Sequence, residues 1–215
     1  MKLCGLDEAG RGPIIGPLVV AGVAVDESMI PQLKEIGVKD SKMLTKIQRE
    51  SMFEQIKAIS HYHILIVEPE EIDAALNHPE LNLNWLEGLK MAEIINELEP
   101  EKAIIDAPSN NIPAFTEFLK KQITNKDIQL TLEHKADEKY EVCSAASILA
   151  KVTRDREIER IKDKVGDCGS GYPSDPKTKE FVEKEWNNHK EIFRTTWATY
   201  KRFANEKKQK SLADY

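Results

Sequence analysis

The chain has few cysteines and no long apolar run, and both absences narrow its class. Among 215 residues there are three cysteines, Cys4, Cys143 and Cys168, none of them in a Cys-x-x-Cys pair. Scattered cysteines in odd number are typical of free thiols in a reducing compartment. No run approaches the length that spans a bilayer, and no basic segment followed by a hydrophobic core begins the chain. We therefore expect a cytoplasmic protein without disulfides or membrane contact.

Two kinds of ligand site lack their usual signatures. His61 and His63 share one face of an apolar segment, but no third soft ligand lies near them, so ordinary strand histidines are favoured over zinc. No Gly-x-x-x-x-Gly-Lys-Ser/Thr motif is present, so a nucleoside triphosphate loop is not indicated.

The composition is globular, and its charge is unevenly distributed. Charged residues make up 32% and hydrophobic residues 40%, which excludes a disordered or membrane class. The net charge is −6, but residues 1–138 carry −10 and residues 139–210 carry +5. A basic carboxyl-terminal third is suited to a phosphate backbone, while acidic groups elsewhere gather cations. Random charge on a solvated surface is the alternative.

Apolar periodicity predicts an opening meander of strands and then alternating helices and strands. We expect strands at residues 2–6, 17–25, 61–67, 103–105 and 128–132. We expect helices at 45–59 with Thr45 as cap, across 70–99, at 113–122, from near Asp137 onward and after Gly171. This order predicts an α/β fold with a mixed five-stranded sheet, flanking helices and a helical carboxyl-terminal extension.

Carboxylates stand where two of these strands end. Asp7 and Glu8 close the first strand and Asp106 closes a later one, while Asp137 begins the long helix. Taken singly, Asp106 is typical of a turn and Asp137 of a helix cap. Adjacent carboxylates repel each other unless a divalent cation holds them. If the strand ends share a rim, the four acids form a site for two Mg²⁺ or Mn²⁺ ions, which favours phosphodiester hydrolysis.

Two further patterns are suited to an anionic ligand. Gly10 and Gly12 let the backbone approach a ligand closely, and Arg11 between them can reach an anion. Helical spacing also predicts one polar face; its members are Asp137, Tyr140, Ser144, Ser147, Lys151 and Arg154. Hydroxyls and lysine at this spacing suit backbone phosphates, although such a face is also typical of solvated surface.

The run from Asp7 to Pro13 resembles type 2 ribonuclease H, and specifically ribonuclease HII of the archaeal kind. Further matching motifs follow in the family's order: Asp40-Ser41-Lys42, Ile105-Asp106-Ala107-Pro108, Lys135-Ala136-Asp137, residues 146–152 and residues 169–176. The resemblance implies an RNase H-like sheet and an endonuclease that cuts the RNA strand of RNA/DNA hybrids, leaving 3′-hydroxyl and 5′-phosphate ends. It also implies cleavage 5′ of single ribonucleotides in duplex DNA, with roles in primer removal and ribonucleotide excision.

The resemblance also assigns roles to individual residues. Asp7, Glu8, Asp106 and Asp137 would be the catalytic metal ligands. Gly10, Arg11 and Gly12 would meet the ribose 2′-hydroxyl and its phosphate, because that hydroxyl distinguishes RNA from DNA. Tyr172 would pack on the neighbouring deoxyribose, although a lone loop tyrosine is the simpler reading of the sequence. Phosphate-contacting positions would be Lys42, Ser147, Lys151 and Arg194.

We expect a catalytic domain at 1–165, a helical substrate-binding region at 166–208 and a tail at 209–215. The chain starts at the catalytic strand, which argues against the related type 3 enzyme with its additional amino-terminal domain. The tail residues Gln209, Leu212 and Tyr215 resemble a sliding-clamp binding peptide, but with one terminal aromatic residue instead of two. A frayed charged tail is the alternative. We expect a monomer.

Two other classes of function are compatible with parts of this pattern. A non-catalytic module that binds hybrids would have lost its acids, yet all four are present. A metal nuclease or recombinase of the same broad fold acting on DNA would need the acids, but neither the Gly-Arg-Gly run nor Tyr172. A duplex with one embedded ribonucleotide discriminates this last class.

Overall fold

The computed structural model describes residues 1–39 and 45–213, with the side chains of residues up to 205. These residues divide into two compact units, each discontinuous in sequence. The sheet unit comprises Met1–Ala9, Val19–Ile66 and Leu83–Thr153. The helical unit comprises Gly10–Leu18, Val67–Asn82 and the chain from Arg154 onward. The division into 1–165, 166–208 and 209–215 stays a prediction.

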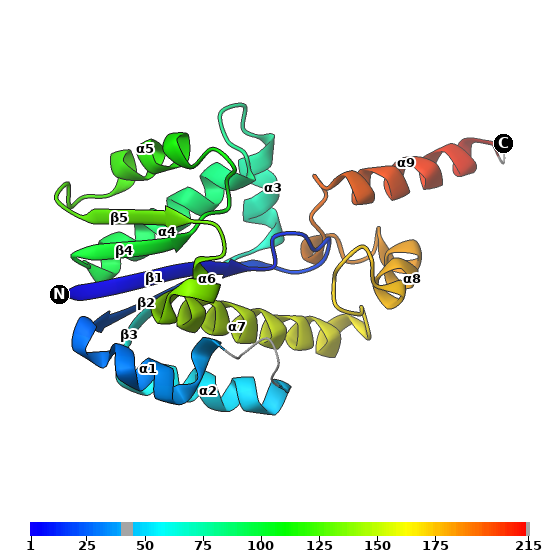
Figure 1. Ribbon diagram of the computed structural model, residues 1–215. Coiled ribbons are helices and arrows are strands. Elements are labelled where there is room, and N and C mark those ends of the chain that lie inside the picture. Colours follow the sequence, from blue (N-terminus) through cyan, green and yellow to red (C-terminus); the bar gives the residue numbers. More distant parts are fainter. Residues whose placement is uncertain (40–44, 214–215) are drawn as a thin grey trace. The chain divides into compact units, whose positions relative to one another are not determined.

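A mixed five-stranded sheet organises the first unit, as predicted (Figure 1). Its strands are β1 (Lys2–Ala9), β2 (Leu18–Asp26), β3 (His61–Val67), β4 (Lys102–Asp106) and β5 (Gln129–Glu133). Their order across the sheet is β3-β2-β1-β4-β5. β1 runs antiparallel to β2 but parallel to β4, and β4 runs parallel to β5. β1 and β4 therefore end at the same edge of the sheet.

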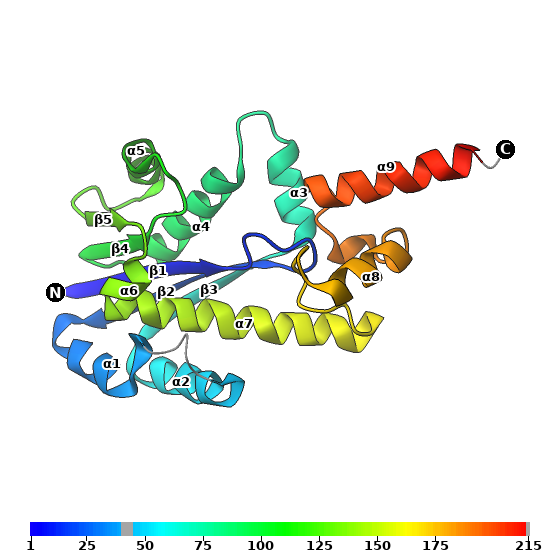
Figure 2. The same cartoon turned by 45° about the vertical axis from the view of Figure 1, so that its right-hand side comes forward.

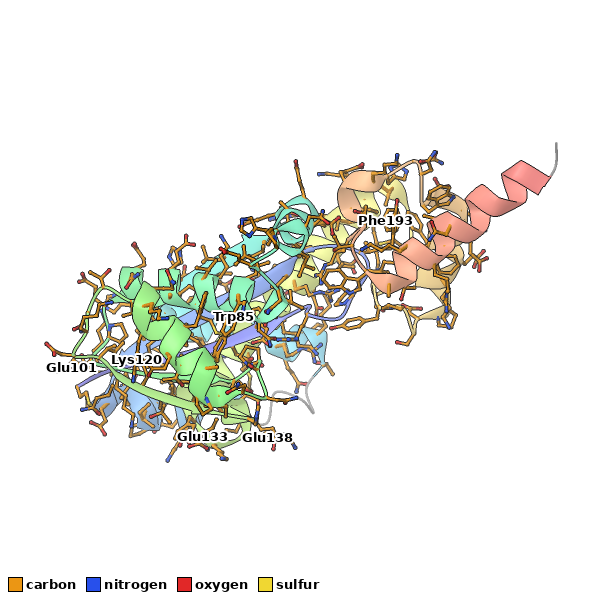
Figure 3. All side chains as sticks on the ribbon, turned by 90° about the horizontal axis from the view of Figure 1, so that it is seen from above. Trp85, Glu101, Lys120, Glu133, Glu138 and Phe193 are labelled. Atoms are coloured by element: carbon orange, nitrogen blue, oxygen red, sulfur yellow. The ribbon has the colours of Figure 1, made fainter. Side chains whose placement is uncertain are left out.

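Helices cover both faces of this sheet (Figures 1 and 2). On one face lie α1 (Ile30–Ile36), α2 (Lys46–Ile59) and the first part of α7 (Glu141–Val165); on the other lie α4 (Leu83–Leu98) and α5 (Ile112–Gln122). Alternate β2 residues, from Val19 to Val25, share a buried apolar core with α1, α2 and α7. Trp85 of α4, marked in Figure 3, packs against Phe118 of α5, with ring centroids 4.5 Å apart.

The start of α2 and the break within residues 70–99 both have local causes. Thr45 and Gln48 form a reciprocal capping box at the start of α2, which confirms the predicted start of this helix. The helical stretch expected across 70–99 is two helices, α3 (Pro69–Asn77) and α4. The break follows from Pro79, because a residue before proline avoids the helical region, and His78 is extended with ψ 132°.

The helical unit packs around its own apolar cluster. Its elements are α3, the end of α7, α8 (Pro176–Glu185), a short 3-10 turn η3 (Lys190–Ile192) and α9 (Ala198–Ala213). Phe193, marked in Figure 3, lies 6.2 Å from Phe181 and 5.5 Å from Tyr200 between ring centroids. Ile14 and Ile15 join this cluster from the chain that follows β1. The cluster thus fixes the residues that come directly after the Gly-Arg-Gly run.

Cys4, Cys143 and Cys168 are free, as predicted, and all three are buried. Among residues 1–39 and 45–213, no helix combines the length and the apolar composition needed to cross a bilayer.

Candidate active site

Three aspartates meet at the edge of the sheet where β1 and β4 end. Leu6 and Ile105 are register partners in these parallel strands, and the next residue in each strand is an aspartate, Asp7 and Asp106. Asp137 reaches the same place from α6 (Ala136–Lys139). Carboxylate oxygens of Asp7, Asp106 and Asp137 lie within 4.8 Å of one another. The structure thereby brings together three of the four predicted acids.

Asp137 belongs to the short helix α6 and not to the long helix that the sequence predicts. The expected long helix from Asp137 is broken at Tyr140, whose extended backbone (φ −119°, ψ 127°) separates α6 from α7. Lys135 adopts a left-handed conformation (φ 59°), and its backbone N–H donates to Asp106 Oδ1 at 2.9 Å. That turn directs α6 toward the end of β4. The prediction of one polar helix face that begins at Asp137 is therefore wrong. Asp137 belongs to α6, whereas the residues from Ser144 to Arg154 belong to α7.

Burial makes this cluster costly when its members are charged. Loss of solvent raises the pKa of Asp7 from 3.8 to about 7, although a hydrogen bond from Ser147 and one from the Glu8 N–H (2.8 Å) oppose the rise. The charges of Asp106 and Asp137 add to it. The pKa of Asp106 is raised by burial and then by Asp137. A cation placed among these oxygens would offset both effects.

The donor set fits hard divalent cations. Mg²⁺ and Mn²⁺ prefer carboxylate oxygens, and the three aspartates provide only oxygen. Asp7 is only 7% exposed, and burial raises its pKa despite two hydrogen bonds, so a cation beside it would stabilise its charged form. The three aspartates therefore fit the Mg²⁺ or Mn²⁺ ions that the sequence predicts.

Glu8 lies beside the cluster in sequence but is not one of the three residues whose oxygens meet. Consecutive strand residues point to opposite faces, so Glu8 and Asp7 start out in different directions from β1. Glu8 is half-buried. Its role as a fourth ligand stays a prediction.

Gly5 explains how α7 comes so close to β1. A Cβ at Gly5 would lie 2.2 Å from the Val142 carbonyl carbon, so only glycine permits this approach. Gly5 and Asp7 are two residues apart on β1 and so share a face. The approach brings the half-buried Ser147 of α7 within hydrogen-bonding reach of Asp7. Ser147 therefore orients a carboxylate, a contact that its predicted role at a phosphate did not include.

The other polar residues of α7 in the sheet unit differ in their environments. Lys151, one helical turn after Ser147, is exposed. Ser144 is buried, and its Oγ donates to the carbonyl oxygens of Asp137 and Tyr140. Ser144 therefore holds the join between α6 and α7.

The helical unit brings the Gly-Arg-Gly run and Tyr172 together. Gly10 has φ +86°, and a Cβ there would lie 2.4 Å from Cδ of Arg154, so this position requires glycine. A Cβ at Gly12 would stand 3.7 Å from the Tyr172 ring. The Arg154 guanidinium lies over that ring at 5.0 Å. Tyr172 is 39% exposed, so its ring offers a surface to a ligand.

The loop that carries Tyr172 is fixed by its backbone. The carbonyl of Gly171 (φ +82°) accepts hydrogen bonds from the N–H groups of Ile14 at 2.8 Å and Ile15 at 3.3 Å. Asp175 caps α8 through the Lys177 N–H and also accepts from the Ser170 N–H at 2.7 Å. Tyr172 thus has an anchored position beside Gly12.

Arg194 is placed unlike a phosphate-contacting side chain. It is 0% exposed, and its guanidinium donates to the carbonyl oxygens of Gly10 (2.6 Å), Arg11 (3.1 Å) and Gly16 (3.0 Å). Its cation also lies 4.9 Å from the Trp197 ring centroid. Arg194 therefore contacts the Gly-Arg-Gly run itself.

Several predicted positions cannot be placed. Lys42 and Tyr215 lie outside the described residues. Gln209 and Leu212 fall within the backbone of α9, but their side chains are outside the described part of the chain. Their predicted roles stay predictions.

Sequence reasoning missed three residues that shape this region. It placed Arg154 only on a polar face, whereas the side chain is 5% exposed and packs on Gly10 and Tyr172. It gave no role to Trp197, whose Nε1 donates to the Gly12 carbonyl at 3.3 Å, or to Asp73, which accepts four hydrogen bonds from Thr195 and Thr196. No local pattern signals such contacts, because their partners are far apart in sequence.

Comparison with known proteins agrees with this geometry. The family profile of ribonuclease HII matches residues 4–200. Ribonuclease HII of Pyrococcus furiosus is 48% identical over 98% of this chain and 94% of its own length. The crystal structure of ribonuclease H2 from Pyrococcus horikoshii OT3 superposes with a TM-score of 0.88 at 44% identity, covering 96% of this chain and 98% of that one.

A third relative is the ribonuclease HII in a solved complex with PCNA from Archaeoglobus fulgidus. It has a TM-score of 0.82 and 44% identity, covering 92% of this chain and 95% of that chain. The chain therefore belongs to the ribonuclease HII family, and the protein is a ribonuclease H that acts on RNA/DNA hybrids and depends on divalent metal ions.

Proposed function

We propose that the protein cuts the RNA strand of hybrids and also incises duplex DNA 5′ of a single ribonucleotide, leaving 3′-hydroxyl and 5′-phosphate ends. The observation that carries the hydrolytic part is the group of three aspartates with oxygens within 4.8 Å of one another. The single-ribonucleotide part is supported by Gly12 and Tyr172, which lie side by side in the helical unit.

The carboxylates act by holding and orienting positive charge. Asp7, Asp106 and Asp137, with Glu8 as fourth ligand, would bind two Mg²⁺ or Mn²⁺ ions, which supply the charge that activates water and stabilises the leaving oxygen. Ser147 donates to Asp7 and the Lys135 N–H donates to Asp106, so both carboxylates are fixed in orientation. Preorganised groups of this kind lower the cost of reaching the transition state.

The Gly-Arg-Gly run and Tyr172 provide the recognition of sugars. Backbone groups of Gly10, Arg11 and Gly12 contact the 2′-hydroxyl and the adjacent phosphate, and the Tyr172 ring packs on the deoxyribose that follows. An enzyme that reads one 2′-hydroxyl and one deoxyribose recognises an RNA-to-DNA junction, which a single ribonucleotide supplies. Lys42 and Lys151 contribute phosphate contacts, which position the duplex without reading its sequence.

A cleavage assay with three matched duplexes tests this function. The duplexes contain one ribonucleotide, a uniform RNA strand or DNA alone, each incubated with Mg²⁺, Mn²⁺ or chelator. We expect cleavage of the first two with metal and of none with chelator. Ligation and polymerase extension of the products identify the 5′-phosphate and the 3′-hydroxyl.

The same assay separates the alternatives. Equal cutting of the all-DNA duplex would favour a DNA nuclease of the same fold, and binding without cleavage under every metal condition would favour a non-catalytic module. Cutting of the uniform hybrid alone would remove the proposed junction recognition but leave the hydrolytic role intact.

We also propose that residues 209–215 bind a replication sliding clamp. The support is the Gln-x-x-Leu-x-x-Tyr pattern of the tail and the existence of a PCNA complex for the Archaeoglobus fulgidus relative. A clamp would keep the enzyme at newly copied DNA, where primers and misincorporated ribonucleotides occur.

A further inference from the structure

The Arg194 guanidinium donates hydrogen bonds to backbone carbonyls within and just after the Gly-Arg-Gly run. Its Nη2 donates to the Gly10 carbonyl, its Nη1 to the Arg11 carbonyl and its Nε to the Gly16 carbonyl. One planar guanidinium thus holds both ends of a turn seven residues long. A lysine ammonium has no comparable planar fork of donors.

These bonds fix the direction of the neighbouring amide groups. In a trans peptide the carbonyl of one residue and the N–H of the next point in opposite directions. Because the Gly10 and Arg11 carbonyls point at Arg194, the N–H groups of Arg11 and Gly12 point away from it. Both N–H groups are thereby oriented by the same side chain.

The segment Arg194–Trp197 is itself anchored on both sides. Trp197 Nε1 donates to the Gly12 carbonyl at 3.3 Å, which extends the grip by one residue. The Asp73 carboxylate of α3 accepts from the N–H groups of Thr195 (2.7 Å) and Thr196 (3.0 Å) and from both hydroxyls. The Arg194 N–H donates to the Ile14 carbonyl at 2.9 Å. The segment is therefore tied to α3 and to the turn that it grips.

We propose that Arg194, supported by Trp197, is a positioning residue that sets the Arg11 and Gly12 amides for recognition of the substrate's 2′-hydroxyl. This inference rests on the proposed reading of that hydroxyl by the Gly-Arg-Gly run. It replaces the phosphate contact that the family resemblance implies for Arg194, because a side chain that is 0% exposed and directed at three carbonyls has no donor face toward solvent.

Steady-state kinetics separate positioning from phosphate contact. We compare the KM of a single-ribonucleotide duplex with the Ki of the same all-DNA duplex used as a competitor, in wild type, Arg194→Lys, Arg194→Ala and Trp197→Phe. Positioning raises the KM by about tenfold in both Arg194 variants, and less in Trp197→Phe, while the Ki stays unchanged. If Arg194 instead contacted a phosphate, its loss would raise KM and Ki equally and would reduce the slope of log KM against log salt concentration by about one. The lysine of Arg194→Lys would then largely retain the contact.

Amide spectra of the ¹⁵N-labelled protein test the positioning itself, without substrate. In Arg194→Ala we expect the Arg11 and Gly12 amide signals to shift and millimolar guanidinium chloride to restore both the signals and the KM, with sodium chloride as the salt control. Arg202→Ala, which removes an exposed arginine of the same unit, should change neither. If Arg194→Ala does not fold, Arg194→Lys and Trp197→Phe carry the same comparison.

The outcomes test two statements separately: that Arg194 positions the amides, and that these amides recognise the 2′-hydroxyl. Unmoved amide signals would overturn the positioning role, whatever the kinetics show. Shifted signals with KM and Ki rising together would overturn its link to the 2′-hydroxyl. If the KM of the wild type for the ribonucleotide duplex equals its Ki for the all-DNA duplex, the proposed recognition of the 2′-hydroxyl is contradicted. The amide shifts would still test separately whether Arg194 positions the Arg11 and Gly12 amides.

Discussion

Asp7 and Asp106 follow a register pair, Leu6 and Ile105, in two parallel neighbouring strands, so their carboxylates leave the sheet side by side. Like charges at this separation are unfavourable in a buried site. The arrangement therefore destabilises the metal-free protein.

Asp7→Asn and Asp106→Asn should each abolish most turnover with Mg²⁺ or Mn²⁺. Losing a ligand removes several kcal/mol of charge stabilisation, so the rate should fall by about 100-fold or more. Initial rates on a uniform hybrid measure this loss. Asp127→Asn removes an exposed acid of the same unit and should leave the rate unchanged. Near-normal rates in either cluster variant would remove that aspartate from the site.

The stability of the metal-free protein should fall as the pH rises. The pKa of Asp7 is about 7 in the folded state against an ordinary 3.8, so between these values the folded protein keeps a proton that the unfolded chain has released. The free energy of unfolding then decreases with pH across this range, by at most about 1.4 kcal/mol per pH unit from this group, and levels off above it.

Denaturant unfolding of wild type and Asp7→Asn in chelator between pH 4 and pH 8 checks this sign, since the window is set by the two pKa values of Asp7. The variant should lack the contribution and be the more stable protein at the alkaline end. A variant less stable than wild type at every pH would show that Asp7 is not held at a cost.

These two aspartates also show what local sequence can predict. Each comes after a run of apolar residues in its strand, and neighbouring parallel strands deliver such residues to the same edge of the sheet, so the meeting of Asp7 with Asp106 was predictable. The predicted end of the first strand at residue 6 was wrong, because β1 continues to Ala9. The break at Tyr140 was not predictable, because Lys-Ala-Asp-Glu-Lys consists largely of good helix formers. The left-handed Lys135, whose N–H binds Asp106, belongs to tertiary structure and leaves no local signal.

Arg194 illustrates a second limit. In a charged helical region its sequence surroundings indicate a surface cation, yet it is buried because it supplies donors to carbonyls more than 170 residues earlier. The split between α3 and α4, in contrast, was readable from Pro79.

Tyr172→Ala should impair cleavage at a single ribonucleotide more than cleavage of a uniform hybrid. Only the first substrate places a deoxyribose next to the ribose, and loss of one aromatic contact costs about tenfold. Tyr172→Phe keeps the ring and should stay near wild type. The ratio of kcat/KM on the two substrates measures the effect.

Tyr62 offers a matched control for this variant. It is 38% exposed and has a lysine 5.5 Å from its ring centroid, close to the exposure and cation contact of Tyr172. Tyr62→Ala should leave the ratio unchanged. An equal loss on both substrates in Tyr172→Ala would place Tyr172 outside junction recognition.

Deletion of residues 209–215 should abolish binding to a sliding clamp in calorimetry. The reason is that Gln209, Leu212 and Tyr215 supply the whole proposed contact. Alanine replacement of Lys207 and Lys208 tests instead whether charge near the tail suffices. Unchanged clamp affinity after the deletion would dispose of the proposed peptide.

The most direct test of the central claim is a crystal grown with Mn²⁺ and measured for the anomalous scattering of manganese. The account predicts a peak bounded by the carboxylates of Asp7, Asp106 and Asp137 in wild type, and its loss or strong weakening in Asp106→Asn. Manganese bound only elsewhere, or an undiminished peak in the variant, would contradict it.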